Sequence, residues 1–180
     1  MTDIQTLSTR IAYENRWMRV REDAIRYRDG SPGIYGVIEK PNFVVVVAVE
    51  PDGSIHLVEQ HRYPVGRRMW ELPQGAWEQR PDADPIAVAR GELREETGLD
   101  AAEILHVGHL LQAPGYATQE YDIYLARGLT RSTAALEHTE QDLITRAFPG
   151  AEVLDLVVTG VIQDASSIAA LGLMKLKGLL

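Results

Sequence analysis

The chain has 180 residues, of which 45% are hydrophobic and 24% charged, so it has the length and composition of one folded domain with a buried core. It contains no cysteine, which excludes disulfides and thiolate metal sites and favours a reducing cytoplasm. A formal net charge of −8 disfavours nucleic-acid binding. No apolar run approaches the roughly 18 residues of a membrane helix, and the N-terminus lacks the pattern of a signal peptide. We therefore expect a cytoplasmic protein with no nucleic-acid or membrane partner.

Residues 1–40 predict a β-structured extension ahead of a main domain that spans 41–180. Residues 1–14 indicate a weakly ordered arm or an edge element. From Trp17 to Glu39 the polarity alternates loosely on both sides of Asp29-Gly30, which is a turn signal. We expect a β-hairpin here, and its amphipathic character suggests a surface for forming a homodimer.

The middle and the end of the chain predict strands framed by helices. Residues 43–50 are almost continuously apolar and β-branched, as in a strand buried on both faces. The turn signal Pro51-Asp52-Gly53-Ser54 follows, and we expect residues 55–60 to form the partner strand. Further strands are expected over residues 70–75, 104–111 and 121–126, a polar loop over 131–142, and helices over 149–158 and 165–176. The sum is an α/β fold, a mixed sheet between helices in an α/β/α sandwich.

A short acidic helix is the most informative segment. Asp84-Pro85 indicates an N-cap followed by proline at the first helical position, and Gly98 is placed to end the helix. Ile86, Ala89 and Leu93 form an apolar stripe. Glu92, Glu95 and Glu96 stand at i, i+3 and i+4, which brings them to one face. That face is either solvated or a metal site, because clustered carboxylate oxygens suit Mg²⁺ or Mn²⁺.

The run Glu92-Leu93-Arg94-Glu95-Glu96-Thr97-Gly98-Leu99 resembles the C-terminal half of the Nudix box. The N-terminal half of the box departs from the family pattern. Gly91 stands at the arginine position and Ala83 at the glutamate position, and the interval from Gly75 to Gly91 is two positions longer than in the motif. The loop between them is therefore enlarged. We expect Arg94 to replace the missing arginine in part, and Gly91 reflects either close packing or drift.

Other segments resemble one branch of the Nudix hydrolases, the ADP-ribose and nucleoside-diphosphate-sugar pyrophosphatases. The segments that show this resemblance are Val58-Glu59-Gln60-His61-Arg62-Tyr63-Pro64, Trp70-Glu71-Leu72-Pro73-Gln74-Gly75, Ala113-Pro114-Gly115-Tyr116 and Ile162-Gln163-Asp164-Ala165. The second run stands where the branch has "E-L-P-A-G". The likeness extends over nearly the whole chain. It implies the Nudix α/β/α fold with an N-terminal extension, a divalent cation, and a homodimer formed with help from residues 17–39.

The resemblance also assigns roles to residues. It makes Glu92 and Glu96 metal ligands, with Glu95 joining or orienting them, and adds the backbone carbonyl of Gln74. The branch takes a catalytic glutamate from the loop before the last strand, where we favour Glu140 over Glu137. A solvated loop acid is the alternative for both.

Candidate substrate-binding residues stand near these segments. A guanidinium suits a diphosphate, so Arg62 is a candidate, whereas Arg67 and Arg68 have ordinary surface roles. Trp17, Tyr63 and Tyr116 are expected either to stack on a base or to belong to the core or an interface. His61 is interpreted as a strand residue. An exposed Trp77 would gate the site or face a dimer partner.

The predicted function is Mg²⁺-dependent hydrolysis of the diphosphate of ADP-ribose or another nucleoside-diphosphate sugar, giving a nucleoside monophosphate and a sugar phosphate. The alternative is a catalytically weak module that binds or senses a nucleotide sugar, motivated by the missing box arginine and glutamate. Hydrolysis of a nucleoside triphosphate or a capped RNA end is a third class, disfavoured by the branch segments and the acidic charge. The sequence does not fix the base or the sugar.

Overall fold

The computed structural model describes residues 4–77, 82–132 and 142–180. The chain divides into two compact units, residues 1–42 with 111–121, and residues 43–110 with 122–180. Among the described residues, no helix combines the length and the apolar character needed to cross a membrane.

The first unit contains a three-stranded antiparallel sheet in the order β1-β2-β3. Its strands are β1 (Ile4–Glu14), β2 (Arg19–Tyr27) and β3 (Pro32–Glu39). The predicted hairpin is confirmed: Gly30 takes a φ of 86° in the turn, and Asp29 accepts a hydrogen bond of 2.9 Å from the Ser31 amide. The N-terminal arm is an edge element but is not weakly ordered, because β1 pairs with β2 from Ile4 to Glu14.

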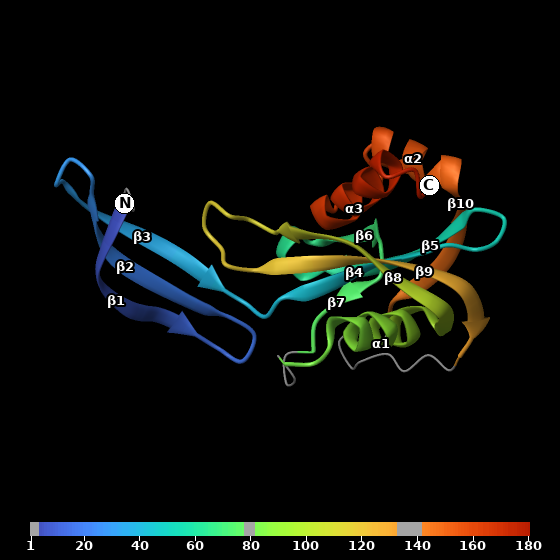
Figure 1. Ribbon diagram of the computed structural model, residues 1–180, viewed down its shortest axis with the longest axis horizontal. Coiled ribbons are helices and arrows are strands. Elements are labelled where there is room, and N and C mark those ends of the chain that lie inside the picture. The colour runs from blue at the N-terminus through green and yellow to red at the C-terminus, as the bar shows by residue number, and fades with distance from the viewer. Residues whose placement is uncertain (1–3, 78–81, 133–141) are drawn as a thin grey trace. The chain divides into compact units, whose positions relative to one another are not determined.

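The second unit is a sandwich of sheets and helices. The four-stranded sheet has the order β7-β4-β9-β8, and the three-stranded sheet the order β10-β5-β6. Figure 1 shows α1 on one side of the four-stranded sheet and α2 with α3 on the other. The elements are β4 (Phe43–Ala48), β5 (Ser54–Arg62), the 3₁₀ turn η1 (Tyr63–Val65), β6 (Arg67–Glu71), β7 (Gln74–Gly75), α1 (Pro85–Thr97), β8 (Leu99–Leu111), β9 (Glu120–Arg131), β10 (Ile144–Pro149), α2 (Gly150–Val158) and α3 (Ala165–Leu176).

Strand β4 lies at the centre of this unit and is buried on both faces, as its apolar run predicts. Alternate residues Val44, Val46 and Ala48 pack in one cluster with the buried side of α1, and Val45 and Val47 are fully buried from the opposite face. The predicted helices over residues 149–158 and 165–176 are confirmed as α2 and α3. The predicted α/β/α sandwich with a mixed sheet is therefore confirmed.

The pairing of β5 differs from the prediction. Strand β5 pairs with β6 and β10, and within the described residues it is joined to the end of β4 by one isolated bridge, between Val49, directly after β4, and Ile55. The turn at 51–54 therefore carries the chain from one sheet into another. Strand β10 was not predicted, because Phe148 is its single buried residue and no alternation marks it.

Candidate active site

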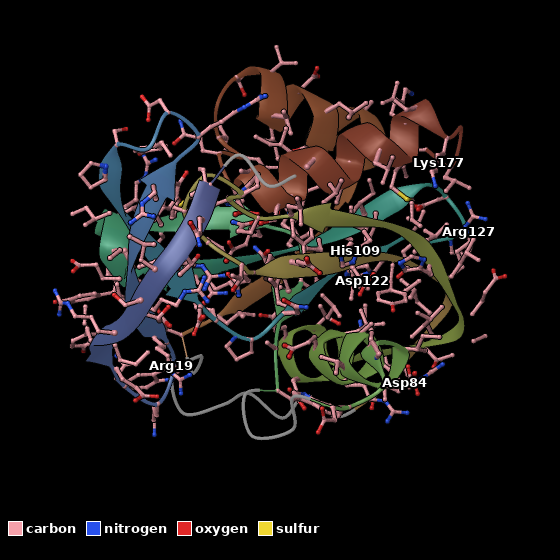
Figure 2. The ribbon with its side chains drawn as sticks, turned by 60° about the vertical axis from the view of Figure 1, so that its left-hand side comes forward. Arg19, Asp84, His109, Asp122, Arg127 and Lys177 are labelled. Atoms are coloured by element: carbon pink, nitrogen blue, oxygen red, sulfur yellow. The ribbon has the colours of Figure 1, made fainter. Side chains whose placement is uncertain are left out.

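Helix α1 begins and ends where the sequence predicts. The Asp84 side chain accepts a hydrogen bond of 3.1 Å from the Ile86 amide, and Pro85 is the first helical residue. At the other end, Gly98 has a φ of 67° and its amide donates to the Arg94 carbonyl at 3.0 Å. Figure 2 labels Asp84 at the start of this helix. The two caps fix the residues at which α1 begins and ends.

The inward face carries two of the three glutamates. Glu92 is 5% exposed and Glu96 is 2% exposed, whereas Glu95 is half-buried. A merely solvated acidic face is therefore wrong for Glu92 and Glu96. The predicted apolar stripe needs one correction, because Ile86 is 43% exposed and Val88 takes its place on the buried face.

Both buried carboxylates lie against strand β7. The Gln74 amide donates a hydrogen bond of 3.0 Å to Glu96 Oε2. A Cβ atom at Gly75 would lie 2.6 Å from Glu92 Cδ, so the glycine leaves the space that this carboxylate fills. The strand and the helix were predicted to form one site, and these contacts bring them together.

This donor set fits a divalent cation that completes its shell with other oxygens. Among residues 4–77, 82–132 and 142–180, no three His, Cys, Asp or Glu side chains are grouped to hold a metal by themselves. Glu92 and Glu96 supply two carboxylates, and the backbone carbonyl of Gln74 is the further oxygen proposed from the sequence. Mg²⁺ is commonly bound in this way, through one or two carboxylates with water and substrate phosphates.

Arg62 lies at the end of β5 and pairs with a buried carboxylate that the sequence did not single out. Its Nη2 is 2.8 Å from Glu71 Oε1, and its Nε donates to Glu71 Oε2 at 3.3 Å. Glu71 is 1% exposed. Burial raises the pKa of the Glu71 carboxyl above its usual value, and the Arg62 charge opposes this shift. Glu71 stands directly before Leu72 and Pro73, and nothing in that sequence indicates that it would be a buried partner of an arginine.

In the N-terminal half of the motif, which departs from the family pattern, apolar side chains occupy the space of the missing charged residues. A Cβ atom at Gly91 would overlap Trp77 Cζ2 and lie 3.0 Å from Trp77 Cε2. Trp77 is half-buried and packs with Ala83 against the core cluster, so the expectation of an exposed Trp77 is wrong. Arg94 does not replace the missing arginine, because it pairs with Asp100 beyond the end of the helix.

The three candidate aromatic residues are exposed and do not belong to the core. In the first unit, Trp17 is 48% exposed beside the Arg16 guanidinium, and Tyr116 is 58% exposed. In the second unit, Tyr63 is 89% exposed on η1. Stacking on a base remains a prediction for each of them.

Two other arginines have the surface roles expected for them. Arg67 bonds to Gln163, and Arg68 contacts Glu59 and Asp142. His61 is an exposed residue of β5, as interpreted. The candidate catalytic acids Glu140 and Glu137 lie outside the described residues.

Family models match both parts of the chain. The model of the nucleoside diphosphate sugar hydrolase N-terminal domain matches residues 4–38, and that of the NUDIX domain matches residues 39–168. An ADP-ribose pyrophosphatase of Mycobacterium tuberculosis (strain ATCC 25618 / H37Rv) is 33% identical over 168 residues, 93% of this chain and 81% of the relative. A methanol dehydrogenase activator of Bacillus methanolicus is 27% identical over 176 residues, 96% of this chain and 93% of the relative.

A solved structure supports the same fold. The crystal structure of an ADP compounds hydrolase matches with a TM-score of 0.86 at 20% identity, covering 99% of this chain and 97% of that one. The fold is of the α/β/α class, and the match of the NUDIX domain model to residues 39–168 places the chain among hydrolases with this fold. The chain belongs to the Nudix family and is a Nudix pyrophosphohydrolase, as the sequence predicts. Members of this family generally use divalent metal cations.

Proposed function

We propose that this enzyme hydrolyses the diphosphate of ADP-ribose or a related nucleoside-diphosphate sugar in a reaction that depends on Mg²⁺. The observation that carries the proposal is the convergence of the buried Glu92 and Glu96 carboxylates on the Gln74–Gly75 strand. The ADP-ribose pyrophosphatase relative and the match to the nucleoside diphosphate sugar hydrolase domain support the substrate class.

In this proposal each residue has one task in the displacement. Water adds to one phosphorus and the bridging P–O bond breaks, leaving a nucleoside monophosphate and a sugar phosphate. A divalent cation would neutralise phosphate charge and activate water. Glu92, Glu96 and the Gln74 carbonyl would hold the cation, and Glu95 would join or orient them. Glu140 accepts the proton that the attacking water releases.

Substrate recognition uses charge on the diphosphate and stacking on the base. The Arg62 side chain is 38% exposed, so its guanidinium can reach a phosphate while it remains paired with Glu71. Trp17, Tyr63 and Tyr116 are the aromatic residues that we propose for base stacking. Their exposure supports this role but does not choose between bases.

The test is a product assay with purified enzyme. ADP-ribose, GDP-mannose and other nucleoside-diphosphate sugars are incubated with Mg²⁺, Mn²⁺ or a chelator, and the products are separated by chromatography. We expect AMP and ribose 5-phosphate from ADP-ribose, and no product with the chelator. Absence of turnover with both metals would overturn the proposal. Tight binding without turnover would instead favour the binding or sensing module, the candidate motivated by Gly91 and Ala83.

We also propose that the enzyme is a homodimer formed with the N-terminal extension. Every residue of β1 is exposed, including Ile4, Leu7, Ile11 and Tyr13, and Ile34 on β3 is 71% exposed. Apolar exposure on this scale marks an interaction surface. Sedimentation at micromolar concentration should therefore give twice the mass of a single chain. A species with the mass of one chain alone would refute the dimer.

A further inference from the structure

The side chain of Gln74 joins two acidic residues that come from distant parts of the chain. Its Nε2 donates one hydrogen bond to Glu71 Oε2 and one to Asp164 Oδ2, both at 3.1 Å. Gln74 is only 8% exposed. Both protons of the amide nitrogen are therefore used on carboxylates.

The Glu71 end of this network leads to the arginine proposed to bind substrate. Glu71 contacts the Nε and Nη2 atoms of Arg62, which form one edge of the guanidinium. Within the described part of the chain, Nη1 makes no hydrogen bond, so the opposite edge remains for a phosphate. The direction in which Arg62 points is thus set by the place of a carboxylate that is 1% exposed.

The Asp164 end is anchored to the last helix. Asp164 Oδ2 accepts hydrogen bonds of 2.7 Å from both the amide and the hydroxyl of Ser167, and it caps α3. The Ser167 hydroxyl in turn accepts a bond of 2.8 Å from the Leu72 amide. The hydrogen-bond network therefore also holds the backbone at Leu72, between Glu71 and Gln74. This restricts the movement of both side chains.

An amide suits this position because two carboxylates approach it from different parts of the chain. Glu71 Oε2 and Asp164 Oδ2 both lie 3.1 Å from the Gln74 amide nitrogen, and carboxylates brought together in a buried site repel each other unless a donor lies between them. An amide nitrogen between them donates to both, whereas the alanine of the "E-L-P-A-G" pattern would donate to neither. The glutamine of this chain is therefore a change with a physical consequence.

We propose that the Gln74 side chain is a positioning residue for substrate binding: it holds Glu71 in place, and Glu71 aims Arg62 at the diphosphate. This inference rests on the proposed function for the role of Arg62. It is separate from the metal role of the Gln74 carbonyl, which a change of side chain leaves in the backbone.

The first experiment compares three variants in the full-length enzyme with ADP-ribose as substrate. Gln74→Ala removes the donor, Gln74→Met keeps the volume without a donor, and Gln74→Glu places a third acid in the network. We expect KM to rise about tenfold for the first two and further for the third, from loss of hydrogen bonds to charged groups. The kcat and the Mg²⁺ concentration for half-maximal rate should change less than about threefold. A lower kcat at constant KM would overturn the proposal.

A double-mutant cycle then tests whether the effect passes through Arg62. In an Arg62→Ala background, Gln74→Ala should change KM by less than about twofold, because the group that it positions is gone. The same tenfold rise in both backgrounds would show a merely structural role and overturn the proposal. If Gln74→Ala does not fold, Gln74→Met serves in the cycle.

A binding measurement separates this proposal from the proposed function. Calorimetry with the non-hydrolysable α,β-methylene ADP and Mg²⁺ needs no turnover. Wild-type binding without turnover of any substrate would refute the enzymatic function, while weaker binding by Gln74→Ala would still support the positioning role. Equal affinity of wild type and variant would overturn the positioning role alone. If the wild type binds neither this analogue nor the α,β-methylene analogues of the other nucleoside diphosphates, both proposals fail.

Discussion

The Nudix-like motif lies on α1 and in the residues before it, and its two halves differ in the kind of side chain that occupies them. The C-terminal half, Glu92 to Gly98, keeps the acidic residues of the family pattern and directs two of them to β7. The N-terminal half has lost the charged residues of the pattern. Trp77 fills the space over Gly91, and Ala83 packs on the core. Groups that bind a ligand cannot be exchanged without changing the chemistry, whereas groups that support them can be replaced by apolar packing of suitable shape.

The largest effect should come from breaking the C-terminal half. Glu96→Gln removes one negative charge, but its amide oxygen can still accept the hydrogen bond from the Gln74 amide. We expect turnover at saturating Mg²⁺ to fall by about 100-fold or more, with the melting temperature nearly unchanged. Glu103→Gln, an exposed change on β8, is the matched control and should keep full activity. Wild-type rates for Glu96→Gln would contradict the metal role.

Substitutions in the N-terminal half of the motif should lower the stability of the folded protein. Gly91→Ala or Gly91→Arg places atoms where Trp77 already lies, so the free energy of unfolding should fall by about 1–3 kcal/mol. Gly172 is the matched control, because it also lies in a helix but a Cβ there meets nothing within 4 Å. Gly172→Ala should therefore raise the free energy of unfolding by about 0.5–1 kcal/mol. Urea denaturation measures both changes.

A second variant tests whether Trp77 is the cause. In a Trp77→Leu background, the penalty of Gly91→Ala should shrink, since the overlapping ring atoms are absent. A Gly91→Arg variant with unchanged stability and higher activity would reject the packing explanation. It would show instead that loss of the arginine weakened the enzyme.

Local signals in the sequence predicted much of this molecule. The ends of α1 follow from Asp84, Pro85 and Gly98, whose effects act within one helical turn. The spacing of Glu92 and Glu96 predicted that the two carboxylates share one face of α1, and the structure buries both against β7, while their metal role stays a prediction. The order of the strands in the sheets was not predictable in this way, because β5 could turn back on β4 or cross to another sheet with the same residues.

Contacts between side chains of different elements also could not be predicted from the sequence. Arg94 was expected to turn toward Glu92, but Asp100 lies just past the helix and offers an opposite charge there. Asp164 contacts Gln74 across 90 residues, and neither residue carries a pattern that names the other. Such pairs depend on how α3 packs, which is decided by the whole core.

The third prediction concerns the start of the helix that both halves share. Asp84→Ala removes the acceptor for the Ile86 amide and leaves that donor without its cap. The free energy of unfolding should fall by about 1 kcal/mol. Asp82→Ala is the control, because Asp82 is exposed and does not cap the helix, and its effect should stay within about 0.5 kcal/mol. Equal effects of the two variants in urea denaturation would count against the cap.

The smallest effect is confined to alkaline pH and reports on the core beneath the N-terminal half. Tyr124 is 3% exposed in the cluster on which Trp77 and Ala83 pack. Burial, followed by the charges of Asp122 and Asp84, raises its pKa from 10.0 to about 12. Figure 2 labels both aspartates. The folded state thus holds this proton more tightly than the unfolded chain does.

The sign of the pH dependence follows from that difference. Below pH 10 the tyrosine is protonated in both states and contributes no slope, and as the pH rises toward 12 the unfolded chain loses the proton first, so stability falls. Tyr124→Phe should remove this part of the alkaline loss in urea denaturation, whereas Tyr116→Phe, which removes an exposed hydroxyl, should leave the loss in place. Asp84→Ala should lower the pKa of Tyr124, because it removes one of the charges that raise it. An identical alkaline slope for wild type and Tyr124→Phe would mean that this hydroxyl is not held in the apolar surroundings on which Trp77 packs.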